Sequence, residues 1–315
     1  MKAIVCTKYG QPDVLQLREV EKPTAKKNEV LIKISATAVT ASDCLVRKLN
    51  PSPWKPRGLM IGLMLGFKKP RSSILGLVLA GTVEDVGKKV TCFKAGDEVF
   101  AFTVKWPTQL RGGAYAEYMC LPEDSLMALK PSNLTYEEAA AIPFGGLIAL
   151  HFLKKGNIQT GQNVLIYGAS GAIGTSAVQL AKHFGATVTG VCSTANLELV
   201  KYLRADTVID YTKEDFTKTG QRYDCILNAV GKRKAQLQCE NALTSNGKHI
   251  TVDDGTPKPQ LEALLLLKEL AETRQLKAVI DRRYPLEQMV EAHRYVDQGH
   301  KKGNVIVTVE PNNKT

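Results

Sequence analysis

The stretch YGASGAIG, residues 167–174, decides the fold of this chain. The apolar run NVLIY (163–167) comes directly before it, and a helix with one apolar face follows it, carrying Ile173, Ala177, Leu180, Ala181 and Phe184. A buried strand, a glycine turn and a helix in this order are typical of a dinucleotide site. The glycines permit a tight turn, and the helix N-terminus presents N–H groups to a pyrophosphate.

Two other phosphate or nucleophile motifs do not fit this turn. The glycine spacing is Gly168-x-x-Gly171-x-x-Gly174, a variant of the usual one. It is not G-x-S-x-G, so a hydrolase nucleophile elbow is not supported, and no Lys-Ser/Thr pair follows, so it is not a P-loop. We therefore expect the turn to bind the cofactor through Gly168, Ser170, Gly171, Ala172, Ile173 and Gly174.

The end of the following strand indicates which dinucleotide is bound. An NAD site usually has an acidic residue about twenty residues after the glycines, but here GVCSTAN (190–196) places Cys192, Ser193 and Thr194 there. The first acidic residue is Glu198, inside the next helix. Ser193, Thr194 and Asn196 can hydrogen-bond a 2′-phosphate, and Lys201 or Arg204 can add charge. NADPH is favoured over NADH.

The flanking regions differ in their pattern. Short strand-like runs fill residues 1–123, which predicts a barrel-like β unit. After Pro131, LTYEEAAAIPFGGLIALHFLKK predicts a helix with a capping box of Thr135 and Glu138. Strands and helices then alternate, as in a doubly wound parallel α/β sheet. The final strand, helix and strand can return to the first unit, giving domains 1–123 with 275–315, and 124–274.

Composition limits the other classes of function. The 315 residues carry a formal charge of +11, yet no nucleic-acid-binding motif is present, and we expect an anionic cofactor and no nucleic acid partner. No run approaches a membrane span of about 18 apolar residues. The N-terminus lacks a secretory signal, and the seven cysteines are dispersed without a CxxC pair, so we expect a cytoplasmic protein.

Several segments together resemble one protein family. MKAIVCTKYGQPDVLQL, VTASDCLVR, LAGTVEDVGKKVTCFKAGDEVFAF, GGAYAEYMCLP and AAAIPFGGLIALHFL occur in order along nearly the whole chain. The chain resembles the medium-chain dehydrogenase/reductase superfamily, and within it the zinc-free quinone oxidoreductase group. The resemblance implies a GroES-like β-barrel catalytic domain, a Rossmann domain and a cleft between them.

The resemblance also bears on zinc. Zinc-dependent relatives carry Cys in the segment that matches VTASD and Gly-His-Glu in the segment that matches GLVLAG. Here the first position is Thr40, and Leu77 and Val78 follow Gly76. A catalytic zinc needs about three protein ligands, so we expect no metal. Without a Lewis acid, hydride transfer to a quinone or to the β-carbon of an α,β-unsaturated carbonyl remains feasible.

The family alignment suggests further site residues. Thr40 and Asp43 match positions near the nicotinamide and substrate, although the alternative is a strand-end turn with local capping. Tyr115 and Tyr118 can donate a hydrogen bond or pack in a strand. Tyr211 matches a position against the adenosine phosphate, and Asn304 falls where the final strand approaches the cofactor or is an ordinary turn residue. Catalysis is assigned to Thr40, Asp43 and Tyr115.

Two segments depart from an ordinary enzyme of this type. WKPRGLMIGLMLGFKKPR (54–71) is a short apolar run between basic residues. It either covers the cleft or contacts a membrane surface peripherally. After DDGTPKP the chain enters QLEALLLLKELAETRQ, about twenty residues sooner than in relatives. The omitted part includes a sixth strand, which predicts a five-stranded sheet and leaves the oligomeric state open.

The sequence thus predicts a zinc-independent, NADPH-dependent oxidoreductase that reduces small-molecule quinones or enones. Two alternatives stay open. One is an alcohol/carbonyl dehydrogenase, which the missing metal ligands disfavour. The other is an NADPH-binding redox sensor with little turnover.

Overall fold

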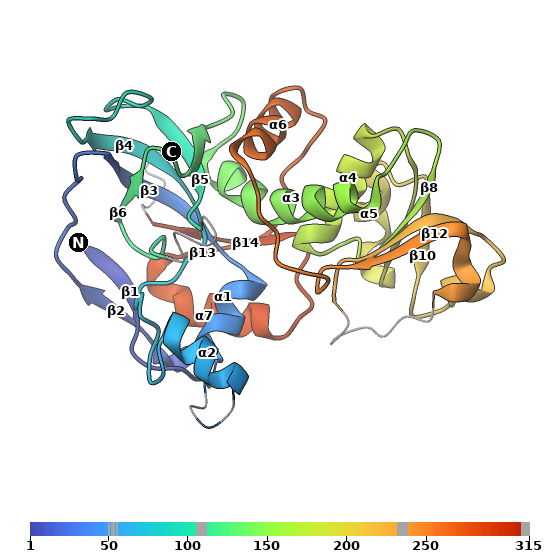
Figure 1. Ribbon diagram of the computed structural model, residues 1–315, viewed down its shortest axis with the longest axis horizontal. Helices are drawn as coiled ribbons and strands as arrows, with labels where there is room; N and C mark the ends of the chain where they lie inside the picture. The colour runs from blue at the N-terminus through green and yellow to red at the C-terminus, as the bar shows by residue number, and fades with distance from the viewer. Residues whose placement is uncertain (50, 52–53, 55, 105–111, 232–238, 310–315) are drawn as a thin grey trace. The chain divides into compact units, whose positions relative to one another are not determined.

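The predicted β runs of the first part of the chain pair with one another and with the end of the chain. The computed structural model describes residues 1–49, 51, 54, 56–104, 112–231 and 239–309, without the side chains of 56–58 and 61. It divides into unit 1, Met1–Pro143 with Ile280–Thr315, and unit 2, Phe144–Val279 (Figure 1). The first boundary lies later than the predicted 123 because a strand at 126–129 still pairs within unit 1.

Unit 1 is built on one mixed sheet in the order β13-β14-β3-β4-β5-β7, with β6 also paired to β3. The last strand, β14, runs antiparallel to β3, which confirms that the chain returns to its first unit. A separate ribbon joins β1 to β2. The strands are β1 Lys2–Cys6, β2 Leu15–Glu19, β3 Glu29–Val39, β4 Val78–Val86, β5 Glu98–Phe102, β6 Tyr118–Pro122, β7 Leu126–Leu129, β13 Ile280–Pro285 and β14 Asn304–Thr308.

The alternation of apolar residues along these strands fills the inside of the sheet. In β3, Val30, Ile32 and Ile34 are fully buried and pack against Leu79 and Val99 from neighbouring strands. Burying each such side chain contributes about 1.5–3 kcal/mol. The described part of unit 1 also contains α1 (Ala41–Arg47), α2 (Pro56–Leu65) and α7 (Met289–Asp297), and α1 packs against α7.

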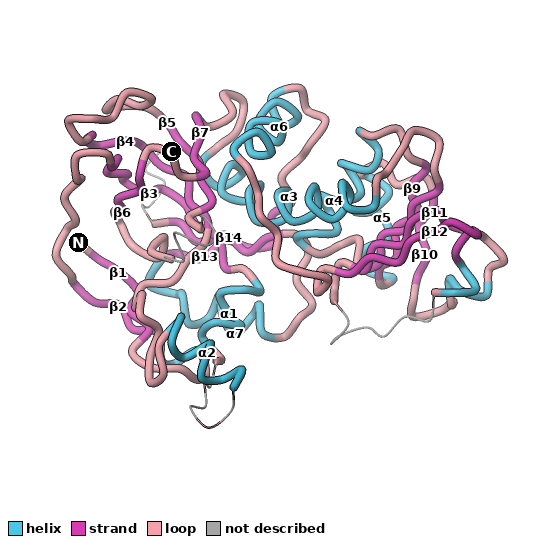
Figure 2. Tube along the Cα trace, viewed as in Figure 1, coloured by secondary structure: helices cyan, strands magenta, loops and turns pink. Residues whose placement is uncertain are grey.

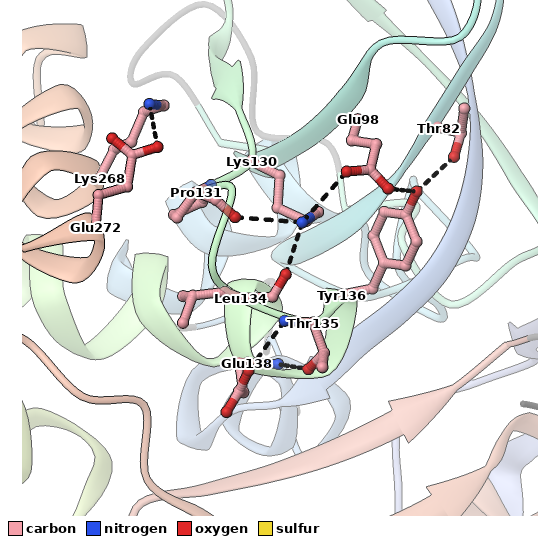
Figure 3. Close-up of polar contacts among 10 residues, drawn as sticks. All are labelled: Thr82, Glu98, Lys130, Pro131, Leu134, Thr135, Tyr136, Glu138, Lys268 and Glu272. Atoms are coloured by element: carbon pink, nitrogen blue, oxygen red, sulfur yellow. Dashed lines mark hydrogen bonds and ion pairs between the residues drawn. The ribbon is translucent and has the colours of Figure 1, made fainter. Parts of the chain in front are cut away.

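The helix α3 (Tyr136–Gly156) begins at the predicted capping box. The Thr135 N–H donates to the Glu138 carboxylate at 2.9 Å, and the Glu138 N–H donates to Thr135 Oγ1 at 3.2 Å. Both bonds satisfy N–H groups that the first turn leaves without helical partners. The capping box is confirmed, and Figure 3 shows both bonds.

A nearly buried lysine fixes the chain just before this helix. Lys130 Nζ donates to the carbonyl oxygens of Pro131 and Leu134, and lies 3.3 Å from Glu98 (Figure 3). The Tyr136 hydroxyl donates to the same carboxylate at 2.6 Å. Because the Lys130 side chain is only 6% exposed, its charge needs these oxygen partners. The network ties the start of α3 to the sheet of unit 1.

Unit 2 holds five parallel strands in the order β10-β9-β8-β11-β12, which confirms the five-stranded prediction. Figure 2 shows them as one twisted layer with helices beside it. The strands are β8 Asn163–Tyr167, β9 Thr187–Cys192, β10 Thr207–Asp210, β11 Tyr223–Asn228 and β12 Leu243–Thr251, and the helices are α4 Ala172–His183, α5 Leu197–Tyr202 and α6 Leu261–Glu272.

The Leu-rich helix α6 packs against α3. A Cβ at Gly146 of α3 would lie 2.7 Å from Leu267, so the glycine permits this close approach. The sequence also predicts a helix over AQLQCENAL. Residues 232–238 lie outside the described residues, and the described part of that segment holds only a 3-10 turn, Glu240–Ala242.

Candidate active site

The glycine turn between β8 and α4 has the geometry that its sequence predicts. Gly168 adopts a φ of +80°, which side chains rarely tolerate. A Cβ at Gly174 would lie 2.0 Å from the carbonyl oxygen of Gly168, so only glycine lets the helix approach the turn. Ala172 and Ile173 form the first turn of α4, whose N-terminus Gly171 caps without a side-chain bond. This end of the helix is suited to an anion.

Three of the predicted cofactor residues meet beside this turn. Asn196 Nδ2 donates to Ser170 Oγ at 3.1 Å and to Ser193 Oγ at 3.2 Å. These bonds join the glycine turn to the end of β9. The Asn196 Oδ1 atom is buried, and no group in the described part of the chain bonds it. An orphaned acceptor of this kind suits a ligand hydroxyl, because leaving it unpaired costs about 1–3 kcal/mol.

Thr194 has a different partner from the one expected. Its hydroxyl donates to the Asp210 carboxylate at the end of β10, which also accepts the backbone N–H and hydroxyl of Thr212. These hydrogen bonds hold the pKa of Asp210 below its usual range. The Thr194 hydrogen is therefore engaged within the protein. The sequence analysis did not identify Asp210 as a site residue, although it directly precedes Tyr211 in TVIDY.

The cations expected near this end of β9 point elsewhere. Lys201 pairs with Glu198 at 3.2 Å, and Arg204 donates to the Gln275 carbonyl. Lys213 Nζ instead lies 3.8 Å from Asp210. Tyr211 is 53% exposed, with its ring 6.2 Å from that of Tyr167, so it remains available to a ligand at this edge of the sheet.

A second candidate site is a cavity of about 80 Å³ within unit 1. Its lining is mainly apolar and comes from α1, α2 and the segment 70–77. The polar groups at its wall are Asp43, Arg71 and Ser72, and the apolar ones include Val46, Leu65 and Leu77. This mixture of apolar and polar groups is found at small-molecule sites, but about 80 Å³ is well below the roughly 300–1,000 Å³ of a pocket that encloses a whole ligand, so the cavity has room for part of a substrate only.

Asp43 is the carboxyl group of this pocket, and it also caps α1. Its Oδ2 accepts the backbone N–H of Thr40 at 2.9 Å and the Thr40 hydroxyl at 2.6 Å. Its Oδ1 accepts the Gly76 N–H at 3.2 Å. The sequence leaves open whether Asp43 caps a helix or lies at the site. In the structure it does both, because it caps α1 and lines the cavity. Thr40 contacts Asp43 and lies outside the pocket lining.

Tyr115 supports Asp43 from the protein side. It is fully buried, and its hydroxyl is one of the groups that lower the pKa of the Asp43 carboxyl. On its other side, His293 Nε2 lies 3.2 Å from the same hydroxyl. Tyr118, the neighbouring tyrosine of β6, instead has its ring under Lys22. The structure therefore brings Thr40, Asp43 and Tyr115 together, with Asp43 facing the pocket.

The buried His293 was not found from the sequence, because it lies on α7, far along the chain. The Arg47 Nε–H lies 3.3 Å from its Nδ1, and arginine can only donate. Nδ1 is then the acceptor, and the proton of the neutral ring is on Nε2, directed to Tyr115. The Tyr115 hydroxyl therefore accepts the hydrogen of His293 Nε2. The contacts of Arg47, His293 and Tyr115 thus run in one direction through the interior of unit 1.

Burial shifts the titration of these groups. Desolvation raises the pKa of Asp43 to about 6, against the hydrogen bonds from Thr40 and Gly76. Burial, together with the charge of Arg47, lowers the pKa of His293 to about 3. Burial also raises the pKa of Cys44, 3.4 Å from His293, to about 12. At neutral pH the histidine and the thiol are uncharged, whereas Asp43 exchanges a proton near this range.

Two further expectations concern Asn304 and metals. Asn304 is buried at the start of β14 in unit 1, and its contact with a cofactor stays a prediction. Among the described residues, no group of three or more His, Cys, Asp or Glu side chains is placed to hold a metal ion.

Comparisons with known proteins agree with both halves of the fold. Residues 26–131 match the alcohol dehydrogenase GroES-like domain, and residues 172–278 and 256–307 match two models named zinc-binding dehydrogenase. A 2-methylene-furan-3-one reductase of Solanum lycopersicum is 35% identical, over 98% of this chain and 79% of its own. An Arabidopsis thaliana NADPH-dependent alkenal/one oxidoreductase is 32% identical with the same coverage.

A solved structure has a similar fold along nearly its whole chain. The quinone oxidoreductase of Coxiella burnetii superposes with a TM-score of 0.84 at 28% identity, covering 98% of this chain and 99% of that one. Near-full-length identity above 30% and both domain matches carry the assignment. The chain is an oxidoreductase that belongs to the medium-chain dehydrogenase/reductase superfamily.

Proposed function

We propose that this protein transfers hydride from NADPH to small quinones or α,β-unsaturated carbonyls without a catalytic zinc. The observation that carries the proposal is the apolar pocket whose wall holds one carboxyl, Asp43, with a raised pKa. Such a pocket takes an uncharged, partly apolar molecule and offers it a proton. Proteins named as alkenal/one and quinone oxidoreductases match 98% of this chain, over 79% and 99% of their own lengths respectively.

The glycine turn and its neighbours fit a phosphorylated dinucleotide. Ser170, Ser193 and Asn196 gather at the end of β9, where NAD-binding proteins usually have a carboxylate. The orphaned Asn196 Oδ1 suits a ribose hydroxyl, and Tyr211 presents an exposed ring. Bound NADPH would supply the hydride. We propose NADPH as the preferred cofactor, with NADH a weaker one.

The pocket residues have distinct roles in the proposed reaction. Addition of hydride to the β-carbon of an enone leaves negative charge on the carbonyl oxygen and the α-carbon. Arg71, at the pocket wall, can donate a hydrogen bond to that oxygen. Asp43 can hold a proton and release it to the substrate, while Thr40 and Tyr115 keep the carboxyl oriented.

The zinc-free part of the proposal rests on side chains. Leu77 lines the pocket where zinc-dependent relatives carry histidine, and Thr40 stands where they carry cysteine. A leucine side chain offers a metal no ligand atom, and a threonine hydroxyl does not replace a thiolate. We also propose that the protein acts in the cytoplasm, since the dispersed free cysteines suit a reducing compartment.

NADPH consumption by chelator-treated protein tests this function. An ortho-quinone, a medium-chain alkenal and a simple ketone are offered in parallel, with NADH in a matched series. We expect turnover of the quinone or the alkenal, faster with NADPH. Turnover of the ketone alone would indicate a carbonyl dehydrogenase. Tight NADPH binding without turnover of any acceptor would instead favour a redox sensor.

A further inference from the structure

The helix α2 presents apolar side chains to solvent. Leu59 is 42% exposed, Met60 57% and Leu63 56%. Residues 59, 60, 63 and 64 are one, three, four or five positions apart, so the helix places them on one side. Phe67 follows the helix, partly exposed. We call this set, Leu59, Met60, Leu63, Met64 and Phe67, the α2 surface.

The helix is held in place by the rest of unit 1. The Tyr9 hydroxyl lies 3.0 Å from the carbonyl oxygens of Leu65 and Gly66, at the C-terminal end of the helix. Phe67 folds back over Gly62, where a Cβ would lie 2.2 Å from its ring. The exposed side chains thus belong to a helix that the rest of unit 1 holds in place. Figure 1 shows α2 at the margin of this unit.

Charge distinguishes this region from an ordinary apolar contact. Residues 44–83 contain seven Lys and Arg and no Asp or Glu. Lys68 and Lys69 are exposed directly after Phe67. Arg47 and Lys48 both pair with Asp297, whereas the remaining five basic residues lie in α2 or within six positions of its ends in sequence. Exposed apolar side chains beside several cations are complementary to a bilayer surface of anionic headgroups.

The α2 surface also adjoins the proposed substrate pocket. Met64 belongs to the α2 surface, is 38% exposed and lines the cavity together with Leu65 and Asp43. The wall of the pocket and the exposed apolar face are therefore parts of one helix. A lipophilic molecule dissolved in a membrane would meet this helix first.

We propose that α2 docks the protein on anionic membrane surfaces, where the pocket receives lipophilic acceptors. No helix within the described residues is long and apolar enough to cross a bilayer, so the contact is peripheral. The proposal that α2 docks on a membrane depends only on the exposed apolar residues and the nearby charges, and not on the proposed function. The delivery of acceptors rests on the proposed function.

Co-sedimentation with vesicles tests the docking. The full-length protein is mixed with phosphatidylcholine vesicles, with and without phosphatidylglycerol. We expect binding to the anionic vesicles only, with the bound fraction reduced about fivefold or more in Met60→Ser/Leu63→Ser and in Lys68→Glu/Lys69→Glu. Matched controls are Leu261→Ser/Leu265→Ser, exposed on α6, and the exposed pair Lys88→Glu/Lys89→Glu, which should bind as the wild type does.

Two further measurements separate the possible failures. All variants should reduce a short, water-soluble enal at the wild-type rate, which shows that they are folded and tests the proposed function by itself. With a long-chain quinone in anionic vesicles, only the α2 variants should lose rate. No binding by the intact protein, or unchanged binding by both α2 variants, would overturn the docking. So would a shift from dimer to monomer in Met60→Ser/Leu63→Ser with vesicle binding intact, since a second copy would then cover α2.

Discussion

At the scale of single residues, two opposing effects determine the pKa of the Asp43 carboxyl. Its position as the third residue of α1 supplies bonds from Thr40 that favour the charged form, while burial favours the neutral form. Burial prevails, and the pKa rises to about 6. A carboxyl at the pocket with this pKa is matched to proton transfer near neutral pH.

Replacing Asp43 by Asn tests this role. If the protonated carboxyl serves the reaction, the wild-type kcat should fall as pH rises through about 6, because the protonated fraction declines. In Asp43→Asn, kcat should drop by about 10²-fold or more and lose this inflection. The measurement is kcat against pH for an alkenal. If Asp43→Asn showed the same dependence of kcat on pH as the wild type, Asp43 would have no part in the mechanism.

Tyr115→Phe provides the companion variant, since a general loss of folding would not shift an inflection. The Tyr115 hydroxyl lowers the pKa of Asp43. Its removal should therefore move the inflection in kcat to higher pH while NADPH affinity stays the same.

His293 makes a prediction about stability. Its folded pKa of about 3 lies below the unfolded value of about 6.5. Between these values the unfolded chain binds a proton that the folded protein does not, so stability is fully present above 6.5 and is lost as pH falls. The slope approaches about 1.4 kcal/mol per pH unit.

The measurement is the free energy of unfolding of wild type and His293→Gln, at pH values about one unit either side of 6.5. Glutamine keeps an acceptor and a donor without titrating, so the variant should lose less stability on acidification. The exposed His300→Gln should behave as wild type. An equal pH dependence in wild type and His293→Gln would contradict the buried neutral histidine.

At the scale of elements, the strand–turn–helix of residues 163–183 follows from local sequence. The spacing of apolar residues and the positions of glycines predict these elements, because strand, turn and helix formation depends on residues that are close in sequence. The partner of Thr194 could not be predicted in this way, because Asp210 reaches it from the next strand of the sheet. The Asn196 bond to Ser170 also joins residues 26 positions apart.

Alanine substitutions in the glycine turn separate packing from ligand contact. Gly174→Ala would place a Cβ 2.0 Å from the Gly168 carbonyl, so α4 must shift, at a cost of about 1–3 kcal/mol in unfolding free energy. Gly171 has room, since its nearest neighbour would be 3.6 Å away at an ordinary φ of −78°. Its alanine variant should cost below about 1 kcal/mol.

Calorimetric titration with NADPH and denaturant unfolding measure the two effects. We expect Gly174→Ala to lose both affinity, by tenfold or more, and stability, a tenfold loss being about 1.4 kcal/mol. Gly171→Ala should lose affinity alone, because its methyl group would meet the ligand. Unchanged NADPH affinity in both variants would place the cofactor elsewhere.

At the scale of the whole molecule, the sequence predicts the two-unit order, the return of the chain through β14 and the five-stranded sheet. It does not predict β7, whose LMAL is too short to stand out, so the boundary at 123 falls short of Pro143. The hydrogen-bonded row of Arg47, His293 and Tyr115 cannot be predicted from the sequence either. It joins α1, α7 and the segment before β6, and only tertiary packing brings these together.

The last prediction concerns metal dependence, where the name of two matching family models and the residues of this chain differ. The models named zinc-binding dehydrogenase match residues 172–278, in unit 2, and residues 256–307, which continue into the last part of unit 1. The segments in which zinc-dependent relatives carry their ligands lie in unit 1, and here they hold Thr40, Leu77 and Val78. Leu77 lines the cavity that Asp43 also lines, so an apolar side chain borders the proposed acceptor site.

Dialysis against a strong chelator should therefore leave kcat and the NADPH affinity unchanged, and metal analysis should find less than one zinc per chain. Adding zinc back should give no increase in rate. A zinc-dependent alcohol dehydrogenase treated in parallel controls for effective chelation. If chelation abolished turnover and zinc restored it, a ligand set beyond these segments would be required, and the carboxyl of Asp43 would lose its place as the proton source in favour of metal activation.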